Sequence, residues 1–278
     1  MDKKELQNPA LYTNRELSWL LFNKRVLSEA RDKQLLLFER LKFLSITASN
    51  LDEFFMVRIG SLVDMIHAEY TKKDIAGMSA KEQLDALMEE THKFAALQYS
   101  TYNRMLLPQL RANGLNFVEH HEQLTERQAQ YVDEYFEENV YPVLTPMAVD
   151  SSRPFPLIRN KTLNIGALVA KKGEKDTEIE FATVQVPSVL PRVVRIPAAK
   201  EGDTEVAVLL LEEIIERNIS KLFLNYNVLC AHPFRITRNA DLAIDEDEAE
   251  DLLLEIEKQI KKRTWGQAIR LEIEAAAD

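Results

Sequence analysis

The sequence predicts an α+β protein in which an all-α helical bundle, residues 1–110, precedes an α+β head domain, residues 111–278, with a mixed or antiparallel sheet. Residues 13–110 carry apolar side chains at helical spacing with one proline, at 108. Residues 141–156 then hold four prolines, which fix an extended loop. Beyond this loop, short runs rich in Val, Ile and Phe alternate with charged turns, as expected for strands.

Capping signals and apolar periodicity divide the first part into helices. T-N-R-E at 13–16 predicts an N-cap at Thr13, with Glu16 at the N3 position of a capping box. The segment 71–80 is expected to be a loop. The other helices are expected at residues 34–46, 50–70 and 81–110.

The second part is expected to combine strands with interleaved helices. Gly114 predicts a helix end followed by a short extended piece, and T-E-R-Q at 125–128 predicts the cap of a helix that reaches residue 140. The charged runs 171–180 and 198–205 are typical of hairpin tips. Strands are expected at 162–170, 178–186, 193–196, 226–236 and 268–273, and further helices at 210–218 and 246–263.

Composition excludes several classes of protein. No stretch of about 18 uncharged apolar residues occurs, and the N-terminus lacks the apolar core of a signal peptide, so we expect a cytoplasmic protein. The single Cys230 rules out an intrachain disulfide. A net charge of -10 argues against non-specific binding of nucleic acid. The first 110 residues hold 15 basic and 15 acidic side chains, which leaves 20 and 30 of the totals of 35 and 45 for the rest, so the first part is the better host for an anionic substrate.

Histidines and acidic residues give weak signals. None of the five histidines has the spacing of a zinc motif, and no glycine-rich phosphate loop occurs, so we expect neither metal ligands nor catalytic residues. His120 and His121 are expected on the solvated surface, and Cys230 in the interior. The acidic cluster 245–251 matches the positive end of a helix dipole better than a metal site. A hydrolase that uses His232 with Asp245 or Glu248 has compositional support only.

The stretch S-N-L-D at 49–52 places polar side chains before an apolar run. Ser49 and Asp52 can form a capping box, which leaves Asn50 unexplained. An asparagine amide offers an acceptor and a donor together, the pair that matches the edge of adenine, and a helix N-terminus attracts anions. Simple capping and packing is the alternative. Arg58 can reach a phosphate, or it can pair with Asp52 or Glu53.

Long motifs resemble the opening segments of polyphosphate kinase of the type that phosphorylates itself on histidine. The resemblance runs in order along essentially the whole chain. It rests on N-R-E-L-S-W-L-L-F-N-K-R-V-L at 14–27, E-R-L-K-F-L-S-I-T-A-S-N-L-D-E-F-F-M-V-R-I at 39–59, P-V-L-T-P-M-A-V-D at 142–150 and P-F-R-I-T-R-N-A-D-L at 233–242.

The resemblance implies a reversible transfer of the terminal phosphate of ATP to inorganic polyphosphate, through a phosphohistidine and with Mg2+. It implies that the helical domain contributes to the ATP site, with Asn50 as its nucleotide-binding asparagine, and that the head domain contributes to homodimer contacts. Family members continue into two phospholipase D-like domains that hold the catalytic histidines and the metal ligands, and no segment of this sequence matches them. We therefore expect no kinase turnover from this chain alone. The alternative is an interaction or dimerisation module without a ligand.

Overall fold

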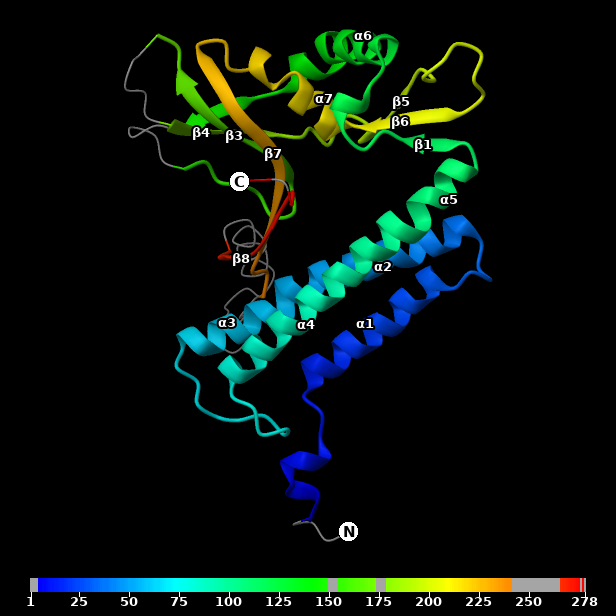
Figure 1. Ribbon diagram of the computed structural model, residues 1–278. Coiled ribbons are helices and arrows are strands. Elements are labelled where there is room, and N and C mark those ends of the chain that lie inside the picture. The colour runs from blue at the N-terminus through cyan, green and yellow to red at the C-terminus, as the bar shows by residue number, and fades with distance from the viewer. Residues whose placement is uncertain (1–4, 150–154, 174–178, 242–265, 276, 278) are drawn as a thin grey trace, which may run out of the picture. The chain divides into compact units, whose positions relative to one another are not determined.

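The computed structural model describes residues 5–149, 155–173, 179–241, 266–275 and 277. The chain divides into two compact units (Figure 1). The helical unit comprises residues 1–109 and 237–270, and the head unit comprises residues 110–236 and 271–278. No helix of the described residues is both long enough and apolar enough to cross a membrane.

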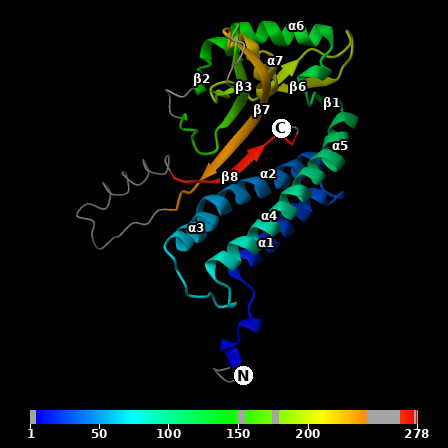
Figure 2. The same ribbon diagram turned by 60° about the vertical axis from the view of Figure 1, so that its left-hand side comes forward.

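Long helices make up most of the helical unit, and two of them continue through π-helical turns. In both views α1, α2 and α4 run alongside one another (Figures 1 and 2). Short 3-10 turns at Glu5–Gln7 and Pro9–Leu11 precede them. The bounds are α1 Arg15–Arg31, α2 Leu37–Phe54, η3 Phe55–Ile59, α3 Gly60–His67, α4 Ala80–Thr101, η4 Tyr102–Leu106 and α5 Leu107–Ala112, the last of which crosses the division between the units.

The structure corrects the predicted start of the first helix. The N-cap is Asn14 rather than Thr13, because the Asn14 side chain accepts hydrogen bonds from the backbone N–H groups of Glu16 and Leu17. Asparagine satisfies these free N–H groups as well as threonine does. The predicted loop at 71–80 is confirmed up to Ser79, which forms the capping box of α4 with Glu82.

A second correction concerns residues 46–50, where the sequence suggested a break between two helices. The chain instead continues helically from Leu37 through the π turn at 55–59 to His67. No glycine or proline interrupts residues 37–59, so nothing forces the backbone out of the helix there. Ser49 and Asn50 are therefore in the body of α2, and the predicted capping box of Ser49 with Asp52 is wrong.

The core of the helical unit is formed by side chains from α1 to α4. Trp19 stacks on Phe54, with ring centroids 4.3 Å apart and planes 8° apart. Ile269, which is distant in sequence, packs against the same core. Burial of these side chains, at about 25 cal/mol per Å² of apolar surface, holds the helices together. The fully or nearly fully buried members are Leu20, Leu27, Ala30, Leu51, Phe54, Phe55, Ile59, Leu62, Ala80, Leu87 and Phe94.

The head unit is built on two sheets, the second of which also includes residues 237–238 and 268–270 of the helical unit. A three-stranded mixed sheet has the order β1-β6-β5, with β1 parallel and β5 antiparallel to β6. A five-stranded sheet has the order β2-β4-β3-β7-β8, and its β2/β4, β4/β3 and β3/β7 ladders are antiparallel. The strands are β1 Leu115–Phe117, β2 Pro146–Val149, β3 Leu163–Lys171, β4 Ile179–Gln185, β5 Val193–Ile196, β6 Val206–Leu210, β7 Tyr226–Arg238 and β8 Ala268–Ile273.

Helices of the head unit cover the buried faces of these sheets. They are α6 Glu126–Tyr135, which continues as the π turn Phe136–Val140, and α7 Leu211–Arg217, with 3-10 turns at His121–Gln123, Tyr141–Val143 and Ile219–Lys221. The predicted capping box of Thr125 with Gln128 is confirmed. A single core includes Val132, Phe136, Ile165, Val184, Leu209, Ile214 and Ile215.

Two strands differ from the sequence prediction. Strand β6 at 206–210 was not predicted, because the charged run before it and the glutamates after it concealed a five-residue apolar segment. Strand β2 forms within the proline-rich segment, where a fixed loop was expected, and Pro146 is its first residue, a position that a proline tolerates. The helix predicted at 246–263 and the acidic cluster at 245–251 lie outside the described residues.

Candidate functional site

Asn50, the predicted nucleotide-binding residue, is on the face of α2 that meets α1. It is half-buried, and its Nδ2 donates a hydrogen bond to Oδ1 of Asn23 at 3.1 Å. Asn23 is completely buried in α1 and donates from its own Nδ2 to the backbone carbonyl of Thr47, also at 3.1 Å. The Thr47 hydroxyl in turn accepts from Nε2 of Gln98, on α4, at 3.0 Å. We call the chain from Thr47 through Asn23 to Asn50 the amide relay.

The amide relay fixes which way the Asn50 side chain points. A backbone carbonyl can only accept a hydrogen bond, so the NH2 group of Asn23 must face Thr47. The oxygen of Asn23 then faces Asn50, which must present its own NH2 group in return. The Asn50 oxygen consequently points away from Asn23.

The Asn50 oxygen has no hydrogen-bond donor among the described residues. It is also not among the described side-chain N and O atoms that are buried without a hydrogen-bond partner. The amide also keeps its second N–H. One turn further along α2, the buried Phe54 stacks on Trp19 of α1, so the two helices are also packed together next to the relay. The arrangement offers an acceptor and a donor in a fixed orientation.

Sequence reasoning did not identify Asn23, although the sequence contains a signal for it. The buried positions of α1 are 20, 23, 27 and 30, and Asn23 is the single polar residue among them. A polar side chain within an apolar stripe requires hydrogen-bond partners inside the protein. Such a residue is therefore a candidate for orienting its neighbours.

Arg58 pairs with none of the partners considered for it in the sequence. Its Nε lies 4.0 Å from Glu16, and 43% of its side chain is exposed, so this contact is weak. Asp52 is instead close to Arg270, with Oδ1 and Nη1 3.4 Å apart, and the Arg270 guanidinium lies over the Phe55 ring at 4.8 Å. Arg58 therefore remains free to turn toward solvent.

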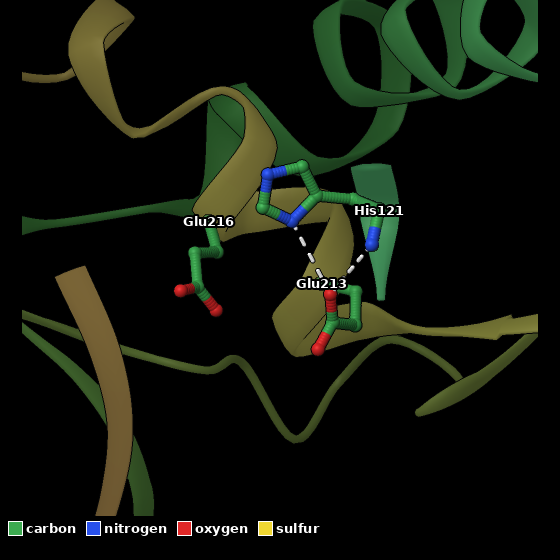
Figure 3. Close-up of side chains that lie close together, drawn as sticks. All are labelled: His121, Glu213 and Glu216. Atoms are coloured by element: carbon green, nitrogen blue, oxygen red, sulfur yellow. Dashed lines mark hydrogen bonds and ion pairs between the residues drawn. The ribbon is translucent and has the colours of Figure 1, made fainter. Parts of the chain in front are cut away.

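The head unit brings histidines and carboxylates together, which the sequence did not predict. The side chain of His121, expected on the solvated surface, is only 19% exposed, and its Nδ1 lies 3.2 Å from Oε2 of Glu213 (Figure 3). The same oxygen accepts from the His121 backbone N–H at 2.9 Å. His232 forms a similar pair with Glu274, at 2.9 Å. Cys230, expected in the interior, is partly exposed.

Neither of these groupings suits the Mg2+ that the resemblance implies. Among the described residues, the two groups of three side chains that could hold a metal are His121 with Glu213 and Glu216, and Glu216 with His232 and Glu274. Each contains an imidazole, whereas Mg2+ selects oxygen ligands and substrate phosphates. We therefore assign no step of a phosphotransfer to them.

Two family models match successive parts of the chain. The family model described as polyphosphate kinase N-terminal domain matches residues 12–118, and the one described as polyphosphate kinase middle domain matches residues 127–278. The chain is 48% identical over 271 residues to a polyphosphate kinase of Halalkalibacterium halodurans, which covers 97% of this chain and 38% of the relative. A polyphosphate kinase of Lactiplantibacillus plantarum is 48% identical over 263 residues, 95% of this chain and 36% of the relative.

A solved structure supports the same assignment. The crystal structure of polyphosphate kinase from Porphyromonas gingivalis superposes with a TM-score of 0.72 at 28% identity, over 91% of this chain and 38% of that one. The chain thus spans somewhat more than a third of the length of the relatives that it matches. On the strength of both family models, this chain belongs to the polyphosphate kinase family.

Proposed function

We propose that this chain supplies an adenine-nucleotide contact and an assembly surface to an ATP:polyphosphate phosphotransferase, which makes inorganic polyphosphate from ATP through a phosphohistidine. The amide relay is the observation that carries this proposal, because it orients Asn50 without consuming its oxygen. The helical unit is the part proposed to serve the ATP site, and the head unit the part proposed to serve assembly. We also propose that the protein is cytoplasmic.

The chemistry of the Asn50 amide favours adenine over guanine. Adenine presents an N6 amino donor beside a ring-nitrogen acceptor, and asparagine can satisfy both at once. In this orientation the Asn50 oxygen accepts from N6 and the second N–H of Nδ2 donates to the ring nitrogen. Guanine carries an oxygen in place of the N6 amino group, so its acceptor would face the acceptor of Asn50.

The phosphotransfer itself requires groups that we do not assign to this chain. A phosphohistidine mechanism needs a histidine nucleophile and cationic groups that stabilise the transferred phosphoryl group. The imidazoles of His121 and His232 are each paired with a carboxylate, Glu213 and Glu274. When bound, Mg2+ neutralises charge on the phosphates. We accordingly propose nucleotide contact without turnover.

The test is calorimetric titration of the 278-residue chain with ATP and with GTP. We expect weak binding of ATP, because a large part of the phosphate contacts of the reaction would come from other polypeptide, and weaker binding of GTP. Asn50→Ala should reduce the affinity for ATP by about tenfold and leave GTP nearly unchanged, in line with the 1–3 kcal/mol of a bidentate base contact.

A matched control is Asn139→Ala, which deletes an exposed amide of the head unit whose Nδ2 donates to the carbonyl of Tyr135. It should leave both titrations unchanged. Tight ATP binding that ignores Asn50→Ala would refute the proposed contact. A chain that elongates polyphosphate unaided would refute the proposed lack of turnover.

Assembly as a homodimer is the second part of the proposal, and apolar side chains on the outer face of the five-stranded sheet favour it. Leu168 is 36% exposed, Ile179 62% and Phe155 59%, and Phe155 stacks on Phe181, the register partner of Leu168. Contiguous exposed apolar surface commonly marks a protein interface. We expect a concentration-dependent dimer that Ile179→Lys weakens. A monomer at high concentration in sedimentation experiments would contradict this part.

A further inference from the structure

Four side chains from four separate segments of the head unit converge around Glu216. Glu216 and Glu213 are one turn apart on α7, and His121 approaches them from the 3-10 turn at 121–123 (Figure 3). The ligating atoms of these three side chains all lie within 4.8 Å of one another. The same holds for Glu216 with His232 of β7 and Glu274, which follows β8.

The two groups adjoin each other as well as sharing Glu216. His120 Nδ1 is 3.8 Å from Oε1 of Glu213 and 3.9 Å from Oε1 of Glu274, so the two carboxylates flank one imidazole. His121 and His232 each have a carboxylate partner, Glu213 and Glu274 respectively. These contacts fix the orientation of the two imidazole rings.

Glu216 is the member without a partner. Its carboxylate accepts no hydrogen bond from the described residues and pairs with no cation among them. It is half-buried, and the carboxylates of Glu213, Glu274, Glu122 and Glu212 are close enough to repel its charge. A half-buried carboxylate among other carboxylates needs a counter-charge, which either a proton or a metal cation can supply.

We propose that the head unit binds one divalent transition-metal cation, of the Zn2+ class, at a site centred on Glu216 and completed by His121, Glu213, His232 and Glu274. This proposal departs from the sequence expectation of no metal ligands. It is also independent of the nucleotide contact proposed for the helical unit.

The donor set selects the class of ion. Two imidazoles with three carboxylates suit Zn2+ and its neighbours in the transition series, whereas Mg2+ and Ca2+ prefer oxygen alone. Zinc ligands lie about 2 Å from the ion, so two ligands on one ion are at most about 4 Å apart. Within each group of three the ligating atoms spread over up to 4.8 Å, which is slightly wider, and the two groups share Glu216, so movements of the other four side chains toward its carboxylate would bring all five onto one ion.

The ion would tie together segments that are far apart in sequence. It would connect the turn at 121–123, α7, β7 and the residues after β8, so binding should stabilise the folded head unit by mass action. We therefore expect ZnCl2 to raise the unfolding temperature of the 278-residue chain and to bind with a stoichiometry of one per chain in calorimetry. MgCl2 at the same concentration should produce neither effect.

Glu216→Gln is the decisive variant because it keeps the side-chain shape and removes repulsion, so it should fold. We expect it to weaken Zn2+ binding by about 10- to 100-fold and to remove most of the thermal shift. The matched control is Glu138→Gln, which makes the same charge change at an exposed position of the head unit and should bind as the parent does. His121→Gln combined with His232→Gln should resemble Glu216→Gln.

A spectroscopic measurement separates this site from adventitious binding to surface histidines. Co2+ in place of Zn2+ should give visible absorption bands that report nitrogen and oxygen ligands, and these bands should be lost in Glu216→Gln. Two results would overturn the proposal: no Zn2+ binding by the parent chain, or Zn2+ binding and Co2+ bands that persist unchanged in Glu216→Gln.

Discussion

The amide relay of the helical unit and the carboxylate cluster around Glu216 in the head unit are both groups of interacting polar side chains, but they differ in charge. The relay consists of neutral amides and a backbone carbonyl, and each donor that enters it meets an acceptor. The cluster contains three carboxylates and two imidazoles, and its central carboxylate has no donor among the described residues.

This difference determines what each grouping can do. Neutral amides that hydrogen-bond to one another cost little to bury, so they can hold a side chain such as Asn50 in one fixed orientation. Crowded carboxylates remain unfavourable until a proton or a cation compensates them. The relay is therefore suited to recognition by shape and hydrogen bonding, and the cluster to binding of a charged species.

Removing the centre of the relay should have the largest effect on stability. Asn23→Ala removes the side-chain hydrogen bonds to the Thr47 carbonyl and from the Asn50 amide and opens a small cavity, so we expect a loss of about 2–3 kcal/mol. Urea unfolding followed by circular dichroism measures this loss. If Asn23→Ala folds, it should also bind ATP more weakly, because the Asn50 amide is no longer held in its orientation.

Asn50→Ala tests whether Asn50 serves the stability of the fold or the recognition of a ligand. Asn50 is half-buried and at the end of the chain of hydrogen bonds, so its removal should cost about 1 kcal/mol or less. If Asn50→Ala were as destabilising as Asn23→Ala, Asn50 would be a structural member of the core rather than an oriented recognition group.

Asp133 of the head unit contrasts with Glu216, because a cation compensates its charge. Asp133 makes a bidentate ion pair with Arg217, at 2.8 and 2.9 Å, and hydrogen bonds from Arg217 hold the pKa of Asp133 below its ordinary value. Asp133→Asn should cost about 1 kcal/mol at neutral pH, after allowance for solvent screening of this partly exposed pair.

The pH dependence of the Asp133 effect has a definite sign. A lowered folded-state pKa means that the contribution is complete above the ordinary pKa of about 3.8 and is lost as the pH falls through the folded value. The difference between the parent and Asp133→Asn, measured by urea unfolding, should therefore shrink toward zero in strong acid. A difference that persisted there would show that the pair acts through packing.

Glu216→Gln should behave in the opposite way when metal is removed with a chelator. The folded-state pKa of Glu216 is raised to about 8, so its protonated form supports the folded state below the ordinary value of 4.5, and this support is lost as the pH rises through 8. The variant should match the parent near pH 4.5 and exceed its stability by up to about 1 kcal/mol above pH 8, after discounting for partial exposure. The charged or titratable groups that face Glu216 are His121, Glu122, Glu212, Glu213, His232 and Glu274.

These two regions also show what the sequence could and could not predict. Fold class, the helices at 81–110 and 125–140 and the strands at 193–196 and 268–273 follow from periodicity and caps, which are local properties. The two groups of polar side chains are harder to predict from the sequence. The partner of Asn50 is 27 positions away, and the groups around Glu216 come from segments that span residues 121–274. Local patterns carry no information about such pairings. A polar residue within an apolar stripe, such as Asn23, still indicates that a buried hydrogen-bond partner must exist, although not which residue it is.

The smallest predicted effect tests the continuity of α2 beneath the relay. Ser49 is exposed and in the body of this helix, where alanine has the higher helix propensity, so Ser49→Ala should stabilise the protein by up to about 0.5 kcal/mol. Ser79→Ala is the matched control at a true N-cap, because the Ser79 side chain accepts from the backbone N–H of Glu82, and it should cost about 1 kcal/mol. A loss from Ser49→Ala similar to that from Ser79→Ala would mean that a helix begins at residue 50. Asn50 would then be at a helix N-terminus, and its orientation would come from the cap rather than from Asn23.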